Sequence, residues 1–377
     1  MKDGAETRRS GVTIVFAGGG TGGHLFPALA IADEIRKRKP DAQIAFVGTR
    51  DKLEARVVPQ RGYSFHAIWI SGLRRTWTFG NLLFPLKVLV ACVQSFFLLR
   101  KLKPDVVVGT GGYVCGPPLV MASLLGIPTV IQEQNTLPGI TTRLLAARAT
   151  QVHLSFAATK EFLKRTDNIV VSGNPTRMTE PIDREEGLRL FHLNPEKKTL
   201  LVFGGSLGAS SINRAVAAIL SDLRAMDVQT IWQTGELDYE SMNRMVQQMR
   251  ADREEPVVRV YKFIDRMQYA YAACDLAVCR AGATTLAELT SYGVPAILVP
   301  YPFAAADHQR RNAEMMVRAK AAEMVHDADL GVQLLGKLQE LLTDDHRRTM
   351  MAERARALGK PDAAATVATA VLALAER

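Results

Sequence analysis

A histidine at the end of a glycine-rich run is the first group in this sequence that could do chemistry. Residues 16–24 read FAGGGTGGH, so that His24 directly follows five glycines and one threonine. Three of the glycines are spaced as in G-x-G-x-x-G, the pattern with which a strand–helix turn binds the pyrophosphate of a dinucleotide. The apolar run VTIVFAG (12–18) precedes the loop. His24 is therefore expected where a buried strand passes into a helix.

A dinucleotide site also needs an acidic residue at the end of the second strand, where it binds the ribose. The second expected strand is QIAFVG (43–48); it ends at Gly48 and Thr49, and Asp51 comes too late for this role. The glycine pattern without its acidic partner is weak evidence for NAD. The glycines could also serve only to let the helix pack closely on the strand.

Two further glycine-rich turns follow apolar runs: GTGGYVCGPP (109–118) and FGGSLGAS (203–210). Repeated turns of this kind at strand ends suggest backbone N–H groups directed at anions. In open α/β sheets, ligands bind beyond the carboxyl ends of the strands. With two such sheets, the cleft between the domains is the natural binding site.

The stretch CRAGATTLAELTSYGVPAILVPYPFAAADHQRRNA (279–313) is the most informative. A helix is expected to begin near Thr285, so that the N–H groups of Ala283, Thr284 and Thr285 point at a phosphate. Glu288 follows one turn later, and its carboxylate could accept two hydrogen bonds from a ribose diol. The alternative for Glu288 is an exposed acid that complements the helix dipole.

Polar side chains also follow the next expected strand of this stretch. After VPYP come Asp307, His308 and Gln309. Their position just past a strand end suits the hydroxyl groups of a sugar.

Short β-branched runs alternate with longer helical patterns, which is typical of a doubly wound parallel sheet. In the first half, the expected strands are 12–18, 43–48, 105–112, 128–134, 151–156 and 168–174. The alternation restarts at 198–220 with a strand, a glycine-rich turn and a helix. Further expected strands are 228–235, 257–264, 274–282 and 294–302.

The chain is thus expected to form two α/β domains, each with a doubly wound parallel sheet, that face a central cleft. The break falls in GNPTRMTEPIDREE (173–186), which is rich in proline and charge and is interpreted as a hinge. The expected domains are residues 1–175 and 176–360. The last helix, within 361–377, could pack on either domain.

The amino-acid composition is that of a folded, basic protein. The chain has 377 residues, of which 47% are hydrophobic and 23% charged, with a net charge of +9 and a pI of about 9.4. A basic balance fits nucleic acid, an anionic membrane or phosphorylated substrates, or only a solvated basic surface. The polar start MKDGAETRRSG is not expected to be a signal peptide, because no apolar run precedes a cleavage site.

Cysteines and the longest apolar stretch give further expectations. The four cysteines form no C-x-x-C pair and are interpreted as buried thiols in a reducing compartment. The stretch LLFPLKVLVACVQSFFLL (82–99) approaches the length of a membrane span, but Pro85, Lys87 and Gln94 interrupt it. A transmembrane helix is therefore disfavoured.

Taken together, the motifs resemble those of the MurG family of GT-B glycosyltransferases. The motifs that carry the resemblance are GGGTGGH, GTGGYVCGP, QEQN, GNP, GGSLGA, RAGATTLAE and DHQRRNA, in the family's order and spacing over nearly the whole chain. The resemblance implies transfer of N-acetylglucosamine from UDP-GlcNAc to the 4-hydroxyl of the muramyl sugar of lipid I, giving lipid II for peptidoglycan. It implies a donor domain in the C-terminal half and an acceptor and membrane domain in the N-terminal half.

The resemblance also implies which residues contact the donor. These are Thr21, Gly22, Asn135, Arg177, Ser206, Ile264, Ala283, Thr284, Thr285, Glu288 and Gln309. Ser206 would bind the phosphates, the backbone of Ile264 would meet the uracil, and Glu288 would hold the ribose. Arg177 would reach the nucleotide from the hinge. Position 308 is histidine here where some members have glutamine, so that its sugar contact is left open.

On the acceptor side, the resemblance places glycine-rich turns around the diphosphate of lipid I. The implied acceptor residues are Gly19, Gly20, Gly23, Gly111, Gly112 and Tyr113, and Thr21 and His24 would face the acceptor and the transferred sugar.

Transfer with inversion needs a base for the attacking hydroxyl. His24 is the first candidate, because the positive end of a helix dipole favours a neutral imidazole that can accept a proton. Glu133 is the rival, and His24 could instead only bind a sugar or the loop. Fixed N–H donors near Ser206 and residues 283–285 could stabilise the leaving diphosphate, and no D-x-D motif indicates a metal or other cofactor.

A membrane-bound acceptor calls for a docking surface. Apolar and basic residues alternate in one region: Leu73, Trp77, Leu82, Leu83, Phe84 and Leu86, among Arg74, Arg75, Lys87, Arg100, Lys101 and Lys103. This mixture fits a peripheral protein on an anionic leaflet, here the cytoplasmic face of the inner membrane. The alternative is that the helix only covers the sheet. Other cell-wall synthesis proteins are possible partners, and nucleic acid is not expected.

Three other functions compete with this interpretation. Another enzyme on the same scaffold, such as a UDP-GlcNAc 2-epimerase or a glycosyltransferase with a different acceptor, is the nearest. A non-catalytic nucleotide-sugar-binding protein is disfavoured by the presence of His24 and Glu133, and a dehydrogenase by the missing ribose acid. The oligomeric state, the acceptor peptide and the extent of domain closure are left open.

Overall fold

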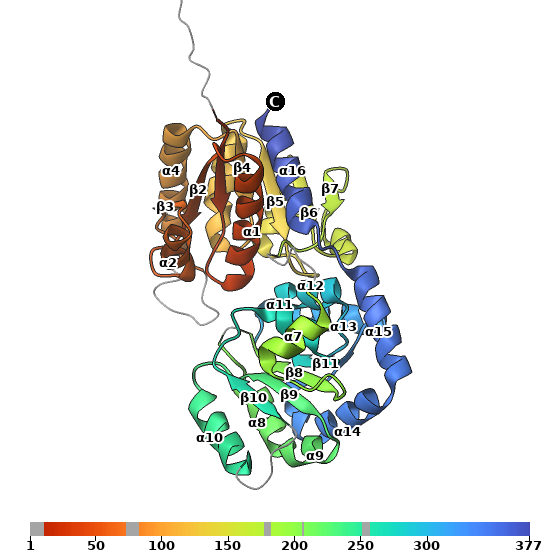
Figure 1. The fold of residues 1–377 in the computed structure, drawn as a ribbon. Helices are drawn as coiled ribbons and strands as arrows, with labels where there is room; N and C mark the ends of the chain where they lie inside the picture. Colours follow the sequence, from red (N-terminus) through yellow and green to blue (C-terminus); the bar gives the residue numbers. More distant parts are fainter. Residues whose placement is uncertain (1–10, 73–82, 177–181, 206, 251–256) are drawn as a thin grey trace, which may run out of the picture. The chain divides into compact units, whose positions relative to one another are not determined.

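The structure is a computed structural model that describes residues 11–72, 83–176, 182–205, 207–250 and 257–377. The chain forms two compact units. The first comprises residues 1–177 together with 362–377, and the second comprises residues 178–361 (Figure 1).

The first unit contains a parallel sheet of seven strands in the order β3-β2-β1-β4-β5-β6-β7. The strands are β1 (Thr13–Ala17), β2 (Gln43–Gly48), β3 (Ser64–Ala67), β4 (Val106–Gly109), β5 (Thr129–Glu133), β6 (Gln151–Leu154) and β7 (Ile169–Val171). The helices used below are α1 (Gly22–Arg38), α2 (Leu53–Gln60), α4 (Phe84–Leu102), α5 (Gly116–Leu124), α6 (Ile140–Leu145) and α16 (Ala363–Ala375).

Each face of this sheet has its own core, because successive residues of a strand point to opposite faces. In β1, Ile14 and Phe16 join the cluster that contains the buried residues of α1 and α16. Val15 and Ala17 join the cluster that contains those of α4 and α5. Burial on both faces explains why the central strands are continuously apolar.

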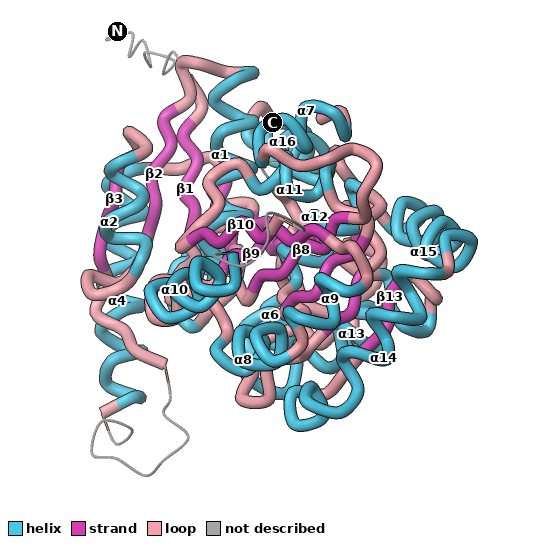
Figure 2. Tube along the Cα trace, turned by 60° about the horizontal axis from the view of Figure 1, so that its bottom comes forward, coloured by secondary structure: helices cyan, strands magenta, loops and turns pink. Residues whose placement is uncertain are grey.

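The second unit contains a parallel sheet of six strands in the order β10-β9-β8-β11-β12-β13. Figure 2 shows β10, β9 and β8 of this sheet side by side. The strands are β8 (Thr199–Phe203), β9 (Gln229–Gln233), β10 (Val258–Tyr261), β11 (Leu276–Cys279), β12 (Ala296–Leu298) and β13 (Ala322–Met324). The helices are α7 (Arg184–Phe191), α8 (Ser210–Ala218), α9 (Leu220–Ala225), α10 (Tyr239–Arg250), α11 (Met267–Ala273), α12 (Ala283–Tyr292), α13 (His308–Arg318), α14 (Leu330–Thr343) and α15 (Asp345–Leu358).

One hydrogen bond recurs in both units. It connects the first strand of each unit with the residue that precedes the unit's fourth strand in chain order. The backbone N–H of Thr13 donates to a carboxylate oxygen of Asp105 at 2.7 Å, just before β4. The backbone N–H of Thr199 donates to Asp275 at 2.7 Å, just before β11. The two units are thus built on the same pattern, as expected from the restart of the alternation.

The expected two parallel-sheet α/β units are confirmed, and each strand expected from the sequence is present. Two strands were not expected, β3 (SFHA) and β13 (AEM). Both are short edge strands without a β-branched run, so periodicity alone could not reveal them. The arrangement of the units about a central cleft stays a prediction, and the hinge residues 177–181 lie outside the described part of the chain.

The last helix belongs to the first unit. α16 packs on α1, with Val367 and Val371 fully buried in the first unit, which decides the choice left open by the sequence.

Cys115, Cys274 and Cys279 are buried free thiols, but Cys92 is only half-buried, so its expected burial was wrong. Cys92 lies on α4, and one side of this helix is exposed to solvent.

Among the described residues, the stretch Asp345–Ala375 is the one long and apolar enough to cross a membrane. It consists of two helices, α15 and α16, and the apolar residues of α16 are buried in the first unit. The apolar stretch 82–99 falls largely on α4, whose Ala91 and Leu99 are buried in the core of the same unit.

Candidate active site at the carboxyl ends of the two sheets

The first site lies in the first unit, where turns after β1, β4 and β5 converge on His24. The imidazole Nδ1 lies 2.9 Å from the side-chain oxygen Oε1 of Gln134, which directly follows β5. The hydroxyl of Thr110, which follows β4, donates to the backbone carbonyl of His24 at 2.9 Å. The parallel sheet thus brings together residues that are up to 110 positions apart.

Two glycines after β4 allow this close approach. A Cβ atom on Gly111 would lie 2.6 Å from Nδ1 of His24, and a Cβ atom on Gly112 would lie 2.7 Å from the carbonyl oxygen of Gly19. Both glycines also have positive φ, +99° and +78°. Any side chain here would therefore clash and be strained.

Glu54 is a site residue that the sequence reasoning missed. Its buried carboxylate accepts from the backbone N–H of Gly20 at 3.0 Å, and from the N–H and hydroxyl of Thr49 at 3.1 and 2.8 Å. It lies on α2, six residues beyond β2. An acidic residue in the first turn after the second strand is the signal that could have found it.

The contact with Glu54 gives a physical reason against a dinucleotide at this loop. A pyrophosphate would need the glycine-rich N–H groups, but the N–H of Gly20 already binds a carboxylate. The same contact also argues against a hydrogen bond from the N–H of Gly20 to the acceptor, because this N–H already donates to Glu54.

Glu133 is buried at the end of β5, and four groups donate to it. Asn135 donates its backbone and amide N–H at 3.1 and 3.5 Å, Gly139 donates its N–H at 3.1 Å, and Thr142 donates its hydroxyl at 2.6 Å. This carboxylate holds the turn that leads into α6. Its oxygens are therefore committed to the fold, whereas the His24 side chain is only half-buried.

The other acceptor-side candidates surround the same turn. Thr21 and Gly23 are exposed, and Gly22 is partly exposed at the first position of α1. Tyr113 lies beside Gly20, since a Cβ atom on Gly20 would be 3.6 Å from its ring. Burial raises the pKa of Tyr113, and a hydrogen bond with Thr49 opposes this shift.

The second site lies at the carboxyl end of the sheet in the second unit. Helix α12 begins at Ala283, two residues before the expected start, after an extended Gly282. Ala283, Thr284 and Thr285 are therefore its first three residues, whose N–H groups have no partner within the helix. Among the described atoms, the buried hydroxyl of Thr284 also lacks a hydrogen-bond partner.

Glu288 points back from α12 to a buried tyrosine. The hydroxyl of Tyr271, on α11, donates to Oε2 of Glu288 at 2.8 Å. Burial raises the pKa of Glu288 to about 7, and the hydrogen bond from Tyr271 opposes this rise. Glu288 is therefore not the exposed first-turn acid of the alternative interpretation, although part of it remains accessible.

A relay of hydrogen bonds connects three strand ends near the expected uracil contact. The backbone N–H of Ile264 donates to Oε1 of Gln233 at 2.8 Å, and Nε2 of Gln233 donates to the carbonyl of Gly205 at 2.9 Å. The N–H of Ile264 is thus occupied. Ser206 in the adjacent turn and Arg177 at the hinge lie outside the described residues.

The turn before α13 and the first two residues of this helix carry the expected sugar contacts. Oε1 of Gln309 accepts from the backbone N–H of Tyr301 at 2.9 Å, and Nδ1 of His308 lies 2.7 Å from the carbonyl of Ala305. Ala306 and Asp307 both have positive φ, 50° and 56°. Strain of this kind in residues other than glycine is concentrated at functional sites.

Arg280 was also missed by the sequence reasoning. It follows β11 and forms an ion pair with Asp327, while its other nitrogen donates to the hydroxyl of Ser211 at 2.8 Å. It also donates to the carbonyls of Val299 and Pro300, both at 3.2 Å. Arg280 therefore connects the ends of β11 and β12 with α8, the helix that follows the expected phosphate turn.

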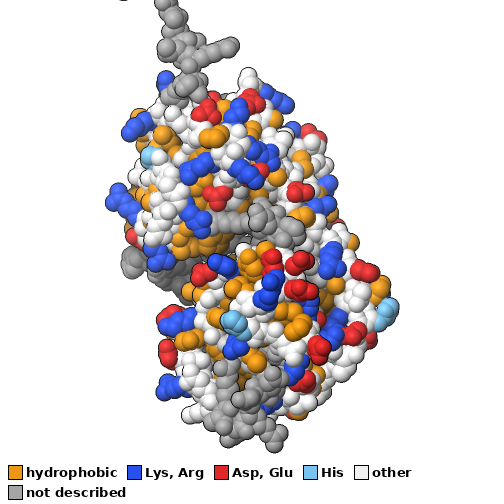
Figure 3. Space-filling model, viewed as in Figure 1, with side chains coloured by type: hydrophobic (Ala, Val, Ile, Leu, Met, Phe, Trp, Pro, Cys, Tyr) orange, Lys and Arg blue, Asp and Glu red, His pale blue; other side chains and the backbone are white. Residues whose placement is uncertain are grey.

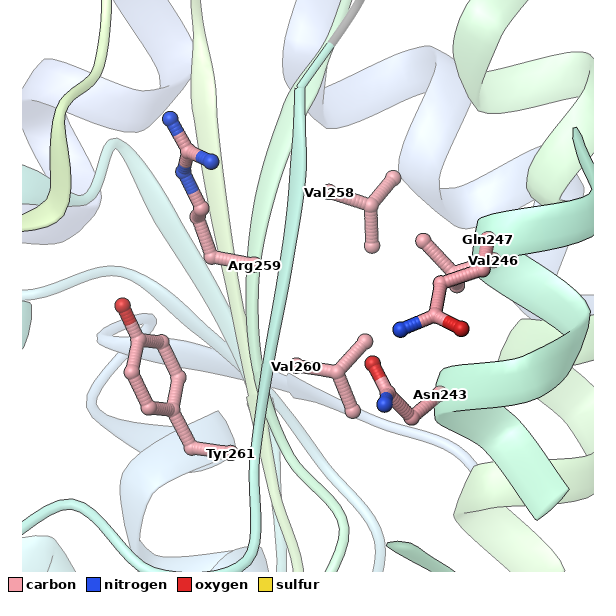
Figure 4. A pocket seen from close by; sticks show the side chains of 7 residues that line it. All are labelled: Asn243, Val246, Gln247, Val258, Arg259, Val260 and Tyr261. Carbon is pink, nitrogen blue, oxygen red and sulfur yellow. The ribbon is translucent and has the colours of Figure 1, made fainter. Parts of the chain in front are cut away.

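A separate cavity of about 150 Å³ lies between α10 and β10 (Figure 4). Val258 and Val260 face Asn243 and Val246 of α10 across it, whereas Arg259 projects from the opposite face of the strand. None of the residues expected in the active site lines this cavity.

Two parallel sheets, each with glycine-rich turns and polar side chains at the carboxyl ends of its strands, are the architecture of the GT-B class, and the family matches show that the protein is a glycosyltransferase. The chain matches the N-terminal domain of glycosyltransferase family 28 over residues 14–154 and its C-terminal domain over residues 199–367. It belongs to this family and, within it, to the MurG enzymes.

The relatives that show this are similar over nearly their whole length. UDP-N-acetylglucosamine–N-acetylmuramyl-(pentapeptide) pyrophosphoryl-undecaprenol N-acetylglucosamine transferase of Salinibacter ruber is 48% identical, covering 97% of both chains. The enzyme of the same name from Prosthecochloris aestuarii is 45% identical, covering 97% of this chain and 99% of its own. The crystal structure of Acinetobacter baumannii MurG is 29% identical with a TM-score of 0.78, covering 96% and 99%.

More distant structures share the fold alone. A UDP-N-acetylglucosamine 2-epimerase from Listeria monocytogenes has a TM-score of 0.64 at 12% identity, covering 95% of each chain. This likeness does not favour the epimerase interpretation over the transferase one, because at this identity only the architecture is shared.

Proposed function

We propose that this protein transfers N-acetylglucosamine from UDP-N-acetylglucosamine to the 4-hydroxyl of the N-acetylmuramyl sugar in an undecaprenyl-diphosphate-linked pentapeptide. The observation that carries the proposal is the 48% identity, over 97% of the chain, to an enzyme named for this reaction. The reaction is the step from lipid I to lipid II in peptidoglycan synthesis.

The donor binds the second unit in this proposal. The free N–H groups at the start of α12 and the turn after β8, including Ser206, take the diphosphate, since the helix dipole favours an anion there. Glu288 accepts hydrogen bonds from the ribose diol, and Ile264 meets the uracil. Because its N–H is bound to Gln233, Ile264 offers its carbonyl oxygen unless Gln233 moves.

The sugar contacts of this proposal come from both units. Gln309, Asn135 and Thr21 contact the N-acetylglucosamine, and Arg177 reaches the nucleotide. Oε1 of Gln309 is held by the backbone of Tyr301, so that its NH₂ group is the end available to a sugar hydroxyl.

The acceptor binds the first unit, where the turns of residues 19–23 and 111–113 leave room for its diphosphate. Because the N–H of Gly20 donates to Glu54, this diphosphate must use other N–H groups of the two turns. His24 is the base of the proposal rather than Glu133. The carboxylate of Glu133 is buried and accepts four hydrogen bonds from its own turn. A base must reach the hydroxyl from which it takes the proton, and the half-buried His24 meets this requirement better.

The chemical step is a displacement at the anomeric carbon with inversion. The muramyl oxygen forms a bond to this carbon while the bond to the diphosphate oxygen breaks, and the hydroxyl proton passes to His24. Negative charge grows on the departing UDP. The N–H groups at the start of α12 stabilise this charge because they are fixed before the reaction begins.

The lipid-linked acceptor is reached, in this proposal, from the surface of an anionic membrane, on its cytoplasmic face. Helix α4 exposes an apolar stripe at helical spacing, in which Leu89 is 62% and Phe97 66% exposed. Exposed Arg100, Lys101 and Lys103 follow at its end. Such a mixture suits an anionic leaflet.

Five members of the expected docking surface lie outside the described residues: Leu73, Arg74, Arg75, Trp77 and Leu82. Figure 3 shows basic and acidic side chains interspersed elsewhere on the visible face of each unit.

A vesicle assay tests the docking surface. The double variant Leu89→Gln and Phe97→Gln is expected to lose at least ~10-fold in affinity for phosphatidylglycerol vesicles at low salt, because two exposed apolar side chains no longer enter the interface. Val332→Gln, at an 87% exposed position on α14, is the matched control and should bind like the parent protein. Equal binding by all three proteins would refute this surface.

A transfer assay tests the proposed reaction itself. The purified enzyme is given radiolabelled UDP-N-acetylglucosamine and a short-chain lipid I analogue, with UDP-N-acetylgalactosamine as the donor control. We expect a labelled disaccharide product and stoichiometric release of UDP. Absence of both product and UDP, with folded protein, would refute the proposed function.

A further inference from the structure

The environment of Gln134 determines which way its side-chain amide points. Its Nε2 lies 2.7 Å from the carbonyl oxygen of Thr110 and 3.1 Å from that of Gln132, and it also meets the side-chain oxygen of Gln132. All three neighbours are acceptors, and only the NH₂ end of an amide can donate to them. The oxygen Oε1 of Gln134 must therefore be the end that faces His24.

This orientation determines the tautomer of His24. Oε1 of Gln134 has lone pairs and no proton, so Nδ1 of His24, 2.9 Å away, must carry the hydrogen of this bond. In a neutral imidazole only one nitrogen is protonated. The lone pair of the ring therefore lies on Nε2.

Packing holds the ring in this orientation. Gly111 approaches it so closely that a Cβ atom would be 2.6 Å from Nδ1 and 2.9 Å from Cε1, and a Cβ atom on Gly112 would be 3.4 Å from Cδ2. The hydroxyl of Thr110 binds the backbone carbonyl of His24, while its own carbonyl binds Gln134. The end of β4 thus holds both partners of the pair.

We propose that Gln134 is a positioning residue that keeps His24 in the Nδ1–H tautomer, so that Nε2 is the atom that takes the proton from the attacking hydroxyl. The inference rests on the proposed function, in which His24 is the base. The O–H bond of the acceptor breaks as its oxygen bonds to the anomeric carbon, and the proton goes to Nε2. The resulting imidazolium keeps its Nδ1–H bond to Gln134 and later loses the new proton to solvent.

Nitrogen NMR of the histidine ring tests the tautomer independently of activity. In the full-length protein at pH 8, the resonances of His24 are identified as those missing from His24→Gln. We expect Nδ1 to be protonated and Nε2 unprotonated in the parent protein, and a mixture of tautomers in Gln134→Leu. The resonances of His66, on β3 at the edge of the same sheet, should not change and report on the fold.

Kinetics test the consequence for catalysis. Gln134→Leu is expected to lower kcat by roughly 10- to 100-fold with less than about a 3-fold change in KM for UDP-N-acetylglucosamine, because general base catalysis is worth about 10²–10⁴. Gln134→Glu keeps an acceptor for the Nδ1 proton, but its second oxygen faces the three acceptors that Nε2 of Gln134 binds, so kcat should be recovered only in part. Its activity should also need a higher pH, since a carboxylate stabilises the imidazolium.

The outcomes separate the inference from the proposed function. An unprotonated Nδ1 in the parent protein, or an unchanged tautomer and kcat in Gln134→Leu, would overturn the positioning role. If the tautomer depends on Gln134 but His24→Gln keeps near-normal kcat, then the proposed base is wrong while the control of the tautomer by Gln134 stands. The measurement on the parent protein decides the tautomer even if the variants fail to fold.

Discussion

At the scale of single residues, Glu288 has the most informative ionisation. Its carboxyl group is buried against α11 with the hydroxyl of Tyr271 2.8 Å away, and burial raises its pKa to about 7. A carboxyl group with this pKa changes its charge near neutral pH. If it binds the ribose as a carboxylate, donor binding must depend on pH in the same range.

The affinity for UDP-N-acetylglucosamine is therefore expected to rise with pH through about 7 and to level off above it. Below this pH Glu288 is protonated, and its uncharged carboxyl group accepts hydrogen bonds from the diol more weakly than the carboxylate does above it. Glu288→Gln should bind about 10-fold more weakly at pH 8 and show no such rise, because hydrogen bonds to a charged group are lost. Titration calorimetry between pH 5.5 and 8.5 measures this.

The choice of ligand and control matters for this measurement. The sugar nucleotide is used because UDP has a terminal phosphate that itself titrates near pH 6. Glu323→Gln, whose carboxyl lies on β13 with Lys337 and Arg347, should leave the pH dependence unchanged. A flat profile in the parent protein would contradict the role of Glu288.

Tyr271→Phe should move the same profile to higher pH. The hydrogen bond from Tyr271 stabilises the ionised carboxylate and lowers the pKa of Glu288, so its loss lets burial raise that pKa further. Affinity at pH 6.5 should fall more than affinity at pH 8.5. Tyr269→Phe, on the same helix with its ring near Arg266, is the matched control; a profile that moved equally in both variants would argue against a specific bond.

At the scale of elements, the turn after β8 depends on two glycines that let it pack on the end of β9. Gly208 has a φ of +80°, and a Cβ atom there would lie 2.1 Å from the carbonyl oxygen of Thr234. Gly235 has a φ of +81° and faces the carbonyl of Leu207 in the same way. The turns after β8 and β9 therefore pack together only if positions 208 and 235 carry no side chain.

Gly208→Ala is expected to destabilise the second unit by roughly 2 kcal/mol or more, because it adds both a steric clash and an unfavourable φ. It should also weaken donor binding by displacing the turn that holds Ser206. Gly336→Ala, in the exposed middle of α14 with nothing near its Cβ position, should instead stabilise by about 0.5–1 kcal/mol. Urea unfolding of both variants measures the difference, and equal effects would contradict this account.

At the scale of the whole molecule, the chain returns to its first unit at the end. Residues 362–377 belong to the first unit although they follow the entire second unit. Helix α16 buries Val367 and Val371 in the core that α1 shares with the sheet. The stability of the first unit thus depends on residues 362–377.

Val371→Ala is expected to cost roughly 1–3 kcal/mol, since it removes two buried methyl groups and leaves a cavity. Hydrogen exchange should increase in α1 and β1, while α8 and β8 of the second unit keep their protection. Val332→Ala makes the same change at an 87% exposed position and should have little effect on either unit. Increased exchange confined to the second unit would show that α16 does not support the first.

The sequence by itself determined the fold class, the family and most of the strands. β-branched runs such as 12–18 and 105–112 are readable because a strand buried on both faces must be apolar throughout. Glycine-rich turns are readable because positive φ and close approach both exclude side chains. The confirmed family follows from several such motifs in a shared order, each of which reflects local geometry.

Only the tertiary structure decided which polar groups are committed to the fold and which remain available. Glu133 is buried and held by Gly139 and Thr142, Glu54 occupies the N–H of Gly20, and Gln134 orients His24. The partners of Glu133 lie within nine positions of it, whereas Gly20 and Glu54 lie 34 and His24 and Gln134 110 positions apart, on segments that only the parallel sheet brings together. A sequence pattern reports local conformation, whereas the protonation and availability of a side chain depend on neighbours that are distant in the chain.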